Sequence, residues 1–258
     1  FAKIFDEAES QKDWERWQKP TNTNPLVPLE ELDIAKREIG SYLFSQEYEA
    51  QFVEQTGGLF KPEWFKYFKK NVYEDYNSDG YLESKTMYLY DNKQVNHNDL
   101  RLITTVDLAT STKESADYTV VCTIGIDKNQ NIFVLDIVRR KLEAPDVLKL
   151  LENVYEKWNP DVIGVESAGY QLALIQMAKR QTTLPIVKLK ADKDKFSRAL
   201  PLSAKMESGL VYYPMDSVWY SDLEKEMMQF PAGEHDDQVD ALAYGILQTS
   251  TRNKFKAY

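Results

Sequence analysis

The sequence has one cysteine and two histidines among 258 residues, and this scarcity excludes some kinds of site. Cys122 has no second cysteine to pair with, and it lies in an apolar run that is typical of a buried structural thiol. Disulfide frameworks and cysteine-based zinc sites are therefore excluded. His235 is one of the two histidines, and its role as a ligand, a base or a loop residue stays open.

Long apolar runs are also absent. No stretch approaches the roughly 20 apolar residues that a membrane-spanning helix needs. The opening FAKIFDEAES lacks the basic-then-apolar pattern of a signal peptide. We therefore expect a soluble, intracellular protein that does not contact a membrane. Because the chain begins at Phe1 rather than at methionine, we also expect a fragment.

The pattern of apolar residues changes near residue 97. Residues 1–97 are polar and predict a mostly helical linker region, with one helix beginning near Glu30, a second over residues 44–52 and a strand over residues 85–90. Residues 98–258 predict elements in the order βββαβαβα, over residues 101–109, 118–126, 132–138, 143–158, 161–167, 171–180 and 184–191, with a last helix from about Asp236. We therefore expect an α/β domain whose mixed central sheet is flanked by helices.

Five acidic residues are candidates for one edge of this sheet. Asp107 ends the first strand and Glu166 ends the strand after the first helix, and a right-handed crossover places two such strands side by side. Asp236, Asp237 and Asp240 open the last helix, within reach of the same edge. Carboxylates that have no Cys or His majority suit Mg²⁺ or Mn²⁺. The alternative is that aspartates at a helix start serve only as caps.

One glycine pair imitates a phosphate-binding loop. The run GVESAGYQ has two glycines at the Walker A spacing, after an expected strand and before an expected helix. Tyr170 and Gln171 occupy the positions that need Lys and Ser or Thr, so neither the phosphates nor Mg²⁺ would be held. We expect no ATPase activity in this chain.

Taken in order, the motifs resemble a known family, the nuclease half of the large terminase subunit of tailed bacteriophages, which is a member of the ribonuclease H-like superfamily. The resemblance rests on TTVDLATSTKESADYTVV, DVIGVESAGYQ, DKDKFSRALPLSAKMESGLVYYP and HDDQVDALAYGI, over roughly residues 100–248. Upstream, TNTNPLVPLEEL and SYLFSQEYEAQFVEQTGGLF are similar to the segment that joins the packaging ATPase to the nuclease. We therefore expect a truncated chain, with residues 1–97 as the linker region and residues 98–258 as the nuclease domain.

The resemblance implies a metal-dependent endonuclease that cleaves double-stranded viral DNA concatemers in the host cell cytoplasm. It implies that Asp107, Glu166 and Asp237 are the catalytic, metal-binding acids, with Asp236 and Asp117 as further metal ligands. Two Mg²⁺ or Mn²⁺ ions, roughly 3.5–4 Å apart, would activate water and stabilise the leaving oxygen. The implied partners are double-stranded DNA, the packaging ATPase domain of the same full-length protein, the portal and the small terminase subunit.

A basic segment is the candidate for contact with DNA phosphates. The net charge of −9 argues against a general nucleic-acid coat but leaves local patches open. We expect the strand and the following turn to line the acidic cleft with Lys188, Lys190, Lys193, Lys195 and Arg198. A solvated surface run is the alternative. A second candidate is the stretch from Arg139 to Lys141 at another strand end.

Two other functions stay open at this point. The chain is compatible with another ribonuclease H-like nuclease, of the junction resolvase or transposase type. It is also compatible with a noncatalytic docking module of a packaging motor, whose acids only cap helices. Periodicity does not decide whether Asp236, Asp237 or Asp240 is the third essential acid.

Overall fold

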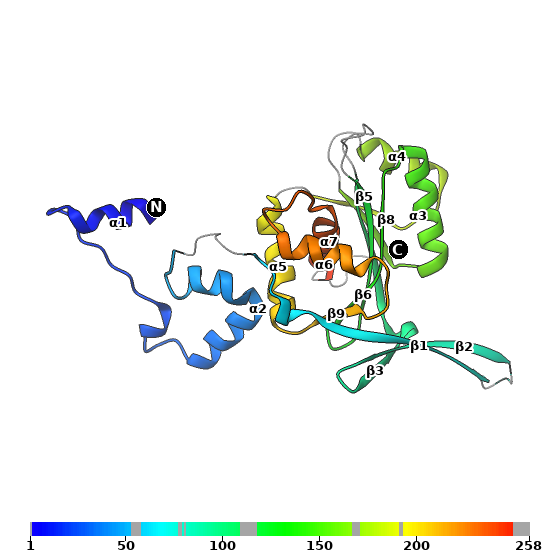
Figure 1. Cartoon of the computed structure of the whole chain (residues 1–258), viewed down its shortest axis with the longest axis horizontal. Helices are drawn as coiled ribbons and strands as arrows, with labels where there is room; N and C mark the ends of the chain where they lie inside the picture. The colour runs from blue at the N-terminus through cyan, green and yellow to red at the C-terminus, as the bar shows by residue number, and fades with distance from the viewer. Residues whose placement is uncertain are drawn as a thin grey trace. The chain divides into compact units, whose positions relative to one another are not determined.

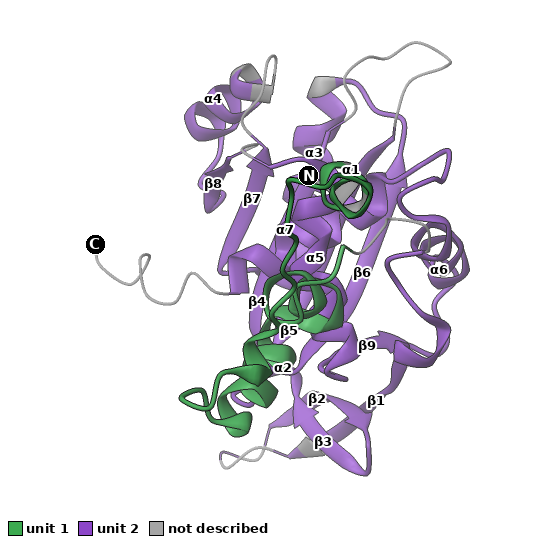
Figure 2. Ribbon diagram, turned by 90° about the vertical axis from the view of Figure 1, so that its left-hand side faces the viewer, with its two compact units in different colours: residues 1–57 green, residues 58–258 purple. Residues whose placement is uncertain are grey.

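The computed structural model describes residues 2–52, 58–76, 79, 81–108, 118–166, 171–190 and 193–249 (Figure 1). The chain divides into two compact units, Phe1–Gly57 and Gly58–Tyr258 (Figure 2). The boundary expected near residue 97 falls inside the second unit, because the strands before it join the same sheet as those after it. None of the helices in the described part of the chain is both long and apolar enough to cross a membrane.

The first unit is helical, as expected for its sequence. Its main helix is α2 (Leu29–Glu47), which follows α1 (Ala2–Glu7), η1 (Ala8–Ser10) and η2 (Thr21–Thr23). Both helices predicted in this region fall on α2, which is kinked at Gly40, where φ is 79°. Glycine suits this position because other residues rarely adopt a positive φ. The second predicted helix ends earlier than expected, at Glu47 rather than near residue 52.

A nine-stranded mixed sheet forms the centre of the second unit, in the order β3-β2-β1-β9-β6-β5-β4-β7-β8. β4, β5 and β6 pair antiparallel, whereas β7 pairs parallel with β4 and with β8, and β9 pairs parallel with β6 and β1. The strands are β1 (Lys66–Tyr76), β2 (Leu82–Tyr90), β3 (Lys93–Asn96), β4 (Arg101–Asp107), β5 (Thr119–Ile126), β6 (Ile132–Arg140), β7 (Val162–Glu166), β8 (Ile186–Leu189) and β9 (Val211–Pro214). The predicted fold class, a mixed α/β sheet, is confirmed.

The strands β1 and β3 were missed in the sequence, and β2 was expected only in part. β1 reads KYFKKNVYEDY, a run without apolar alternation, and Val72 and Tyr76 are exposed in the structure. β1 and β2 pair with each other beyond the stretch where β1 meets β9, so much of this ribbon is open to solvent. A strand that buries neither face has no apolar periodicity to reveal it.

Helices cover both faces of the sheet (Figure 1). The described helices of the second unit are η3 (Pro62–Trp64), η4 (His97–Asp99), α3 (Ala144–Trp158), α4 (Gln171–Gln181), α5 (Lys195–Glu207), α6 (Tyr220–Gln229) and α7 (Asp237–Thr249). On one face, Val106 of β4 and Ile163 of β7 share a buried cluster with Leu151 of α3. On the other face, α7 packs on β4 and β5, and α5 and α6 pack on α7.

The helix α5 corrects one expectation. Lys195 and Arg198 were expected in a loop and turn, but both lie on α5. The helix begins at Lys195 because Asp194 caps it, accepting a hydrogen bond of 2.9 Å from the backbone N–H of Ser197. Pro201, a residue that usually interrupts helices, lies inside α5 and hid it in the sequence. Together with β9 and α6, it extends the predicted element order between β8 and the last helix.

Candidate active site

Asp107 and Glu166 lie at neighbouring strand ends. β4 and β7 run parallel with Val106 opposite Val165, so the next residue on each strand is an acid at the same edge, as predicted. Thr105 faces α7, because its hydroxyl donates a hydrogen bond of 2.6 Å to the carbonyl of Ala241. Side chains alternate between the two faces of a strand, so Asp107, two residues later, also faces α7. Val165 lies in the core under α3 and α4, so Glu166 also faces α7.

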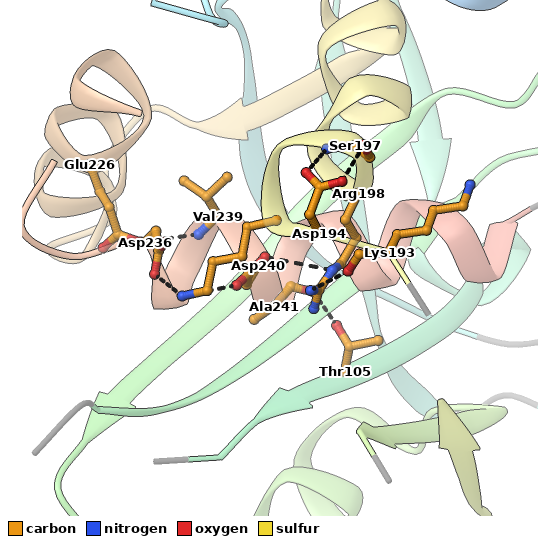
Figure 3. A network of polar contacts seen from close by, with 11 residues as sticks. Thr105, Lys193, Asp194, Ser197, Arg198, Glu226, Asp236, Val239, Asp240 and Ala241 are labelled. Carbon is orange, nitrogen blue, oxygen red and sulfur yellow. Dashed lines mark hydrogen bonds and ion pairs between the residues drawn. The ribbon is translucent and has the colours of Figure 1, made fainter. Parts of the chain in front are cut away.

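The first turn of α7 is held by a buried acid from α6. Glu226 accepts hydrogen bonds from the backbone N–H of Gln238 at 2.6 Å and from the Gln238 side chain at 2.8 Å. It also accepts from the backbone N–H of Val239 at 3.1 Å (Figure 3). Backbone N–H groups at a helix start have no partner within the helix, so Glu226 acts as its cap. Thr105 anchors the same helix one turn later, at Ala241. These two contacts fix α7 above the strand ends.

Four carboxylates crowd together where α7 meets the strand ends. Burial raises the pKa of Asp107 well above its ordinary value of 3.8, and Asp240, Asp237 and Glu166 raise it further. Lys195 acts in the opposite sense. Asp107, Glu166, Asp237 and Asp240, with Asp236 beside them, are called the acid cluster below. Like charges held this close in a poorly hydrated site disfavour the ionised form of Asp107.

Asp240 is the most enclosed member of the acid cluster. Only 3% of it is exposed, and its partners are the Lys195 Nζ at 3.5 Å and the Arg198 Nε at 3.9 Å. Burial raises its pKa to about 6, with a further contribution from Asp236, against the lowering effect of the two cations. Its Oδ1 atom is buried and accepts no hydrogen bond from any described residue. This oxygen retains its capacity to bind a donor or a cation.

Asp237 and Asp236 differ in burial and in the groups that they contact. Asp237 is buried, and its Oδ2 lies 3.5 Å from the backbone nitrogen of Tyr118. Asp236 is half-buried and pairs with the Lys195 Nζ at 2.5 Å. The structure therefore brings Asp107, Glu166 and Asp237 together, with Asp236 at their margin. The fifth predicted ligand, Asp117, lies outside the described residues.

The five predicted DNA-contacting residues do not form one stripe. Lys188 pairs with Val165, so it lies on the sheet face opposite Glu166, and the expectation that it lines the acidic cleft does not hold. Lys190 and Lys193 are exposed. Lys195 is exposed at the edge of the acid cluster, where it contacts Asp236 and Asp240. Arg198 is buried, with its guanidinium 4.3 Å from the centre of the Tyr244 ring.

Comparison with known families matches residues 104–249, more than half of the chain, to the Terminase RNaseH-like domain. The chain belongs to this family. Among solved structures, it is similar to the large terminase nuclease from thermophilic phage G20c with bound magnesium, at 16% identity and a TM-score of 0.52, over 76% of this chain and 99% of that one. The same nuclease with bound cobalt gives the same identity, coverage and TM-score. At this identity the likeness establishes the fold. Comparison with curated proteins finds no match.

Two further parts of this terminase domain were missed in the sequence. Glu226 supports α7, and its position on α6, three residues after Leu223 and directly before Met227, is on the apolar face of that helix. An acidic residue on the apolar face of a predicted helix could have indicated this role in the sequence, because a buried carboxylate needs hydrogen-bond or ion-pair partners. Tyr118 was missed because it holds Asp237 through its backbone.

Arg139, a predicted second DNA contact, packs beside Tyr118. Its guanidinium carbon lies 3.9 Å from the centre of the Tyr118 ring. Its Nε and Nη2 atoms are buried and donate no hydrogen bond to the described residues. The charge also lowers the pKa of Glu226, against the dominant effect of burial, which raises it. Arg139 therefore supports both residues that hold the start of α7.

The acid cluster suits a hard cation in its chemistry. Its donors are all carboxylate oxygens, which Mg²⁺ and Mn²⁺ prefer. An added positive charge relieves its crowded charges and can be bound by the Asp240 Oδ1, which accepts no hydrogen bond from a described residue and has only the Arg198 Nε at 3.9 Å. Among the described residues, no three Asp, Glu, His or Cys side chains already converge closely enough to hold an ion.

Proposed function

We propose that this terminase domain is a metal-dependent endonuclease that cleaves double-stranded viral DNA concatemers during genome packaging. The observation that carries the proposal is the half-buried Asp107, which shares its site with Glu166, Asp237 and Asp240. Such crowding is unfavourable in the ion-free protein and is relieved when a cation binds. The crystal structures of the phage G20c nuclease with magnesium and with cobalt support a divalent ion in this fold.

We assign the ion-binding role to the acids at the strand ends and at the start of α7. Asp107, Glu166 and Asp237 would hold two Mg²⁺ or Mn²⁺ ions, with Asp236 and Asp117 as additional ligands. When bound, such ions activate water and stabilise the leaving oxygen of a phosphodiester. The protein's own part is to keep the acids in place, because Glu226 of α6 and Thr105 of β4 both hold α7.

The substrate and partners follow from the same proposal. Double-stranded DNA would meet the acid cluster, with Lys193 as a phosphate contact near it and Lys190, Lys195 and Arg198 as further candidates. The partners would be the packaging ATPase domain of the full-length protein, the portal and the small terminase subunit, in the host cytoplasm. This chain itself would hydrolyse no ATP.

Cleavage of supercoiled plasmid DNA tests the proposal. The wild type should nick and linearise the plasmid with Mn²⁺ or Mg²⁺, and it should be inactive with a chelator. Asp107→Asn should be inactive, whereas Asp222→Asn, which removes the same charge from an exposed site on α6, should cleave normally. Cleavage that persists in Asp107→Asn contradicts the site assignment.

A four-way DNA junction in the same assay separates the alternatives. Strong preference for the junction over linear duplex favours a resolvase. Absence of cleavage together with absence of Mn²⁺ binding favours a docking module. ATP turnover above a buffer blank contradicts the expected lack of ATPase activity.

A further inference from the structure

Lys195 is placed against the acid cluster by the start of α5. Its Nζ lies 2.5 Å from the Asp236 Oδ1 and 3.5 Å from the Asp240 Oδ2. Asp194 fixes the turn that presents it, accepting from the backbone N–H of Ser197 at 2.9 Å and from its hydroxyl at 2.6 Å (Figure 3). Because α5 packs on α7, this lysine is held beside the cluster by two helices rather than by a loose loop.

The charge of Lys195 acts on the cluster beyond its two ion pairs. Burial alone would lower the pKa of Lys195, but Asp236, Asp240 and Asp107 outweigh it and raise the pKa. In return, Lys195 lowers the pKa of Asp107. The ammonium is thus a cation already present on the Asp236–Asp240 side of the cluster. On that side the buried Asp240 Oδ1 still lacks a hydrogen bond from any described residue.

We propose that Lys195 is a resident cation of the acid cluster, which occupies its Asp236–Asp240 side and competes there with a divalent ion. The proposal rests on the function proposed above, in which the cluster binds such ions. An ion that uses Asp240 must approach the Lys195 ammonium, which lies 3.5 Å from the Asp240 Oδ2 and repels it, and must also approach Arg198, whose Nε lies 3.9 Å from the Oδ1. Asp107, Glu166 and Asp237 form the side that remains available.

Replacing Lys195 by methionine removes this competition and keeps most of the side-chain volume. Lys195→Met should bind Mn²⁺ about tenfold more tightly than the wild type, because a repelling charge is lost and Asp236 is released. Lys195→Arg keeps the charge and should bind Mn²⁺ like the wild type. Lys225→Met removes the same charge from an exposed position on α6 and should also leave Mn²⁺ affinity unchanged.

The experiment is calorimetric titration of Mn²⁺ into each DNA-free, chelator-treated protein, with circular dichroism to confirm the fold. DNA is left out so that phosphate contacts of Lys195 cannot contribute. An Mn²⁺ affinity of Lys195→Met at least about threefold above that of the wild type and of Lys225→Met supports the proposal. A smaller increase, or a decrease, overturns it.

Failure of this inference is distinguishable from failure of the proposed function. If the wild type cleaves DNA with Mn²⁺ while Lys195→Met and the wild type bind Mn²⁺ equally, only the role of Lys195 is overturned. If neither variant binds Mn²⁺ and neither cleaves, both proposals are overturned. If Lys195→Met misfolds, Lys195→Gln takes its place in the same comparison, with the same threshold.

Discussion

Replacing individual acids of the cluster should affect cleavage and stability differently. Asp107→Asn, Glu166→Gln and Asp237→Asn should each abolish Mn²⁺-dependent cleavage, because each removes a proposed ligand. Their melting temperatures without metal should equal or exceed that of the wild type, since each removes one of several crowded like charges. Plasmid cleavage and thermal melts with a chelator measure the two effects. An inactive variant with a strongly lowered melting temperature would indicate a structural role instead.

The two adjacent aspartates at the start of α7 should differ in importance. Asp237 is buried beside Tyr118, whereas Asp236 is half-buried and paired with Lys195. We therefore expect Asp236→Asn to keep appreciable cleavage activity while Asp237→Asn loses it. Rates of plasmid linearisation at saturating Mn²⁺ provide the comparison. The opposite order would transfer the third essential role to Asp236.

The raised pKa of Asp240 predicts that the stability of the metal-free protein depends on pH. Burial raises its pKa from 3.8 to about 6, so the folded state holds the proton more tightly than the unfolded state. This contribution is fully present below the ordinary pKa and is lost as pH rises through about 6. Relative to Asp240→Asn, the wild type should therefore lose on the order of 1–1.5 kcal/mol between about pH 5 and pH 8, the upper part of that range. Urea unfolding with a chelator at about pH 5 to pH 8 measures this loss, and parallel curves for the two proteins would contradict it.

Among the elements, α7 depends on a cap that comes from another helix. Glu226→Ala leaves the N–H groups of Gln238 and Val239 without their acceptor, which should lower the free energy of unfolding by about 1–3 kcal/mol. Cleavage should fall as well, because the first turn carries Asp237 and Asp240. Lys225→Ala, an exposed change on the same helix, serves as the control in urea unfolding. Equal stability of the two variants would show that α7 is held without this cap.

Elements with a buried face were predictable from the sequence, and those without one were not. β5 and β7 read as apolar runs because both are covered by helices, and their neighbour β4 brought Asp107 beside Glu166 as expected. β1 buries little, and α5 contains Pro201, so neither produced a clear pattern.

Contacts between distant elements could not be predicted from periodicity. Lys195 and Asp236 are 41 positions apart, and Thr105 and Ala241 are 136 apart. The face of Lys188 depends on how β8 pairs with β7, which local sequence does not specify. The acids were therefore found by type and position, and Lys195 was expected along the acidic cleft as a DNA contact. Its ion pairs with Asp236 and Asp240, and the residues that hold α7, were not predicted.

At the scale of the whole molecule, the two faces of the sheet should differ in DNA binding. Lys193 is exposed next to Arg198, whose Nη2 donates to its carbonyl at 3.2 Å, on the side of the acid cluster. Lys188 lies on the opposite face. Lys193→Ala should weaken duplex binding equally for all sequences and reduce the salt slope by roughly one unit, whereas Lys188→Ala should change neither. Fluorescence anisotropy at several salt concentrations, with a chelator to prevent cleavage, tests this. Equal effects of the two changes would mean that DNA does not approach from the face with the acid cluster.

The acid cluster draws on β4, β7 and α7, and α7 is the last element of the described chain. A ribosome releases Asp107 first, Glu166 next and Asp237 much later. A nascent chain that already displays the first two acids therefore cannot complete the cluster, however well its sheet has formed. Under the proposed function, cleavage would begin only after the final helix has emerged and docked, and a chain that ends before Asp237 would be inactive.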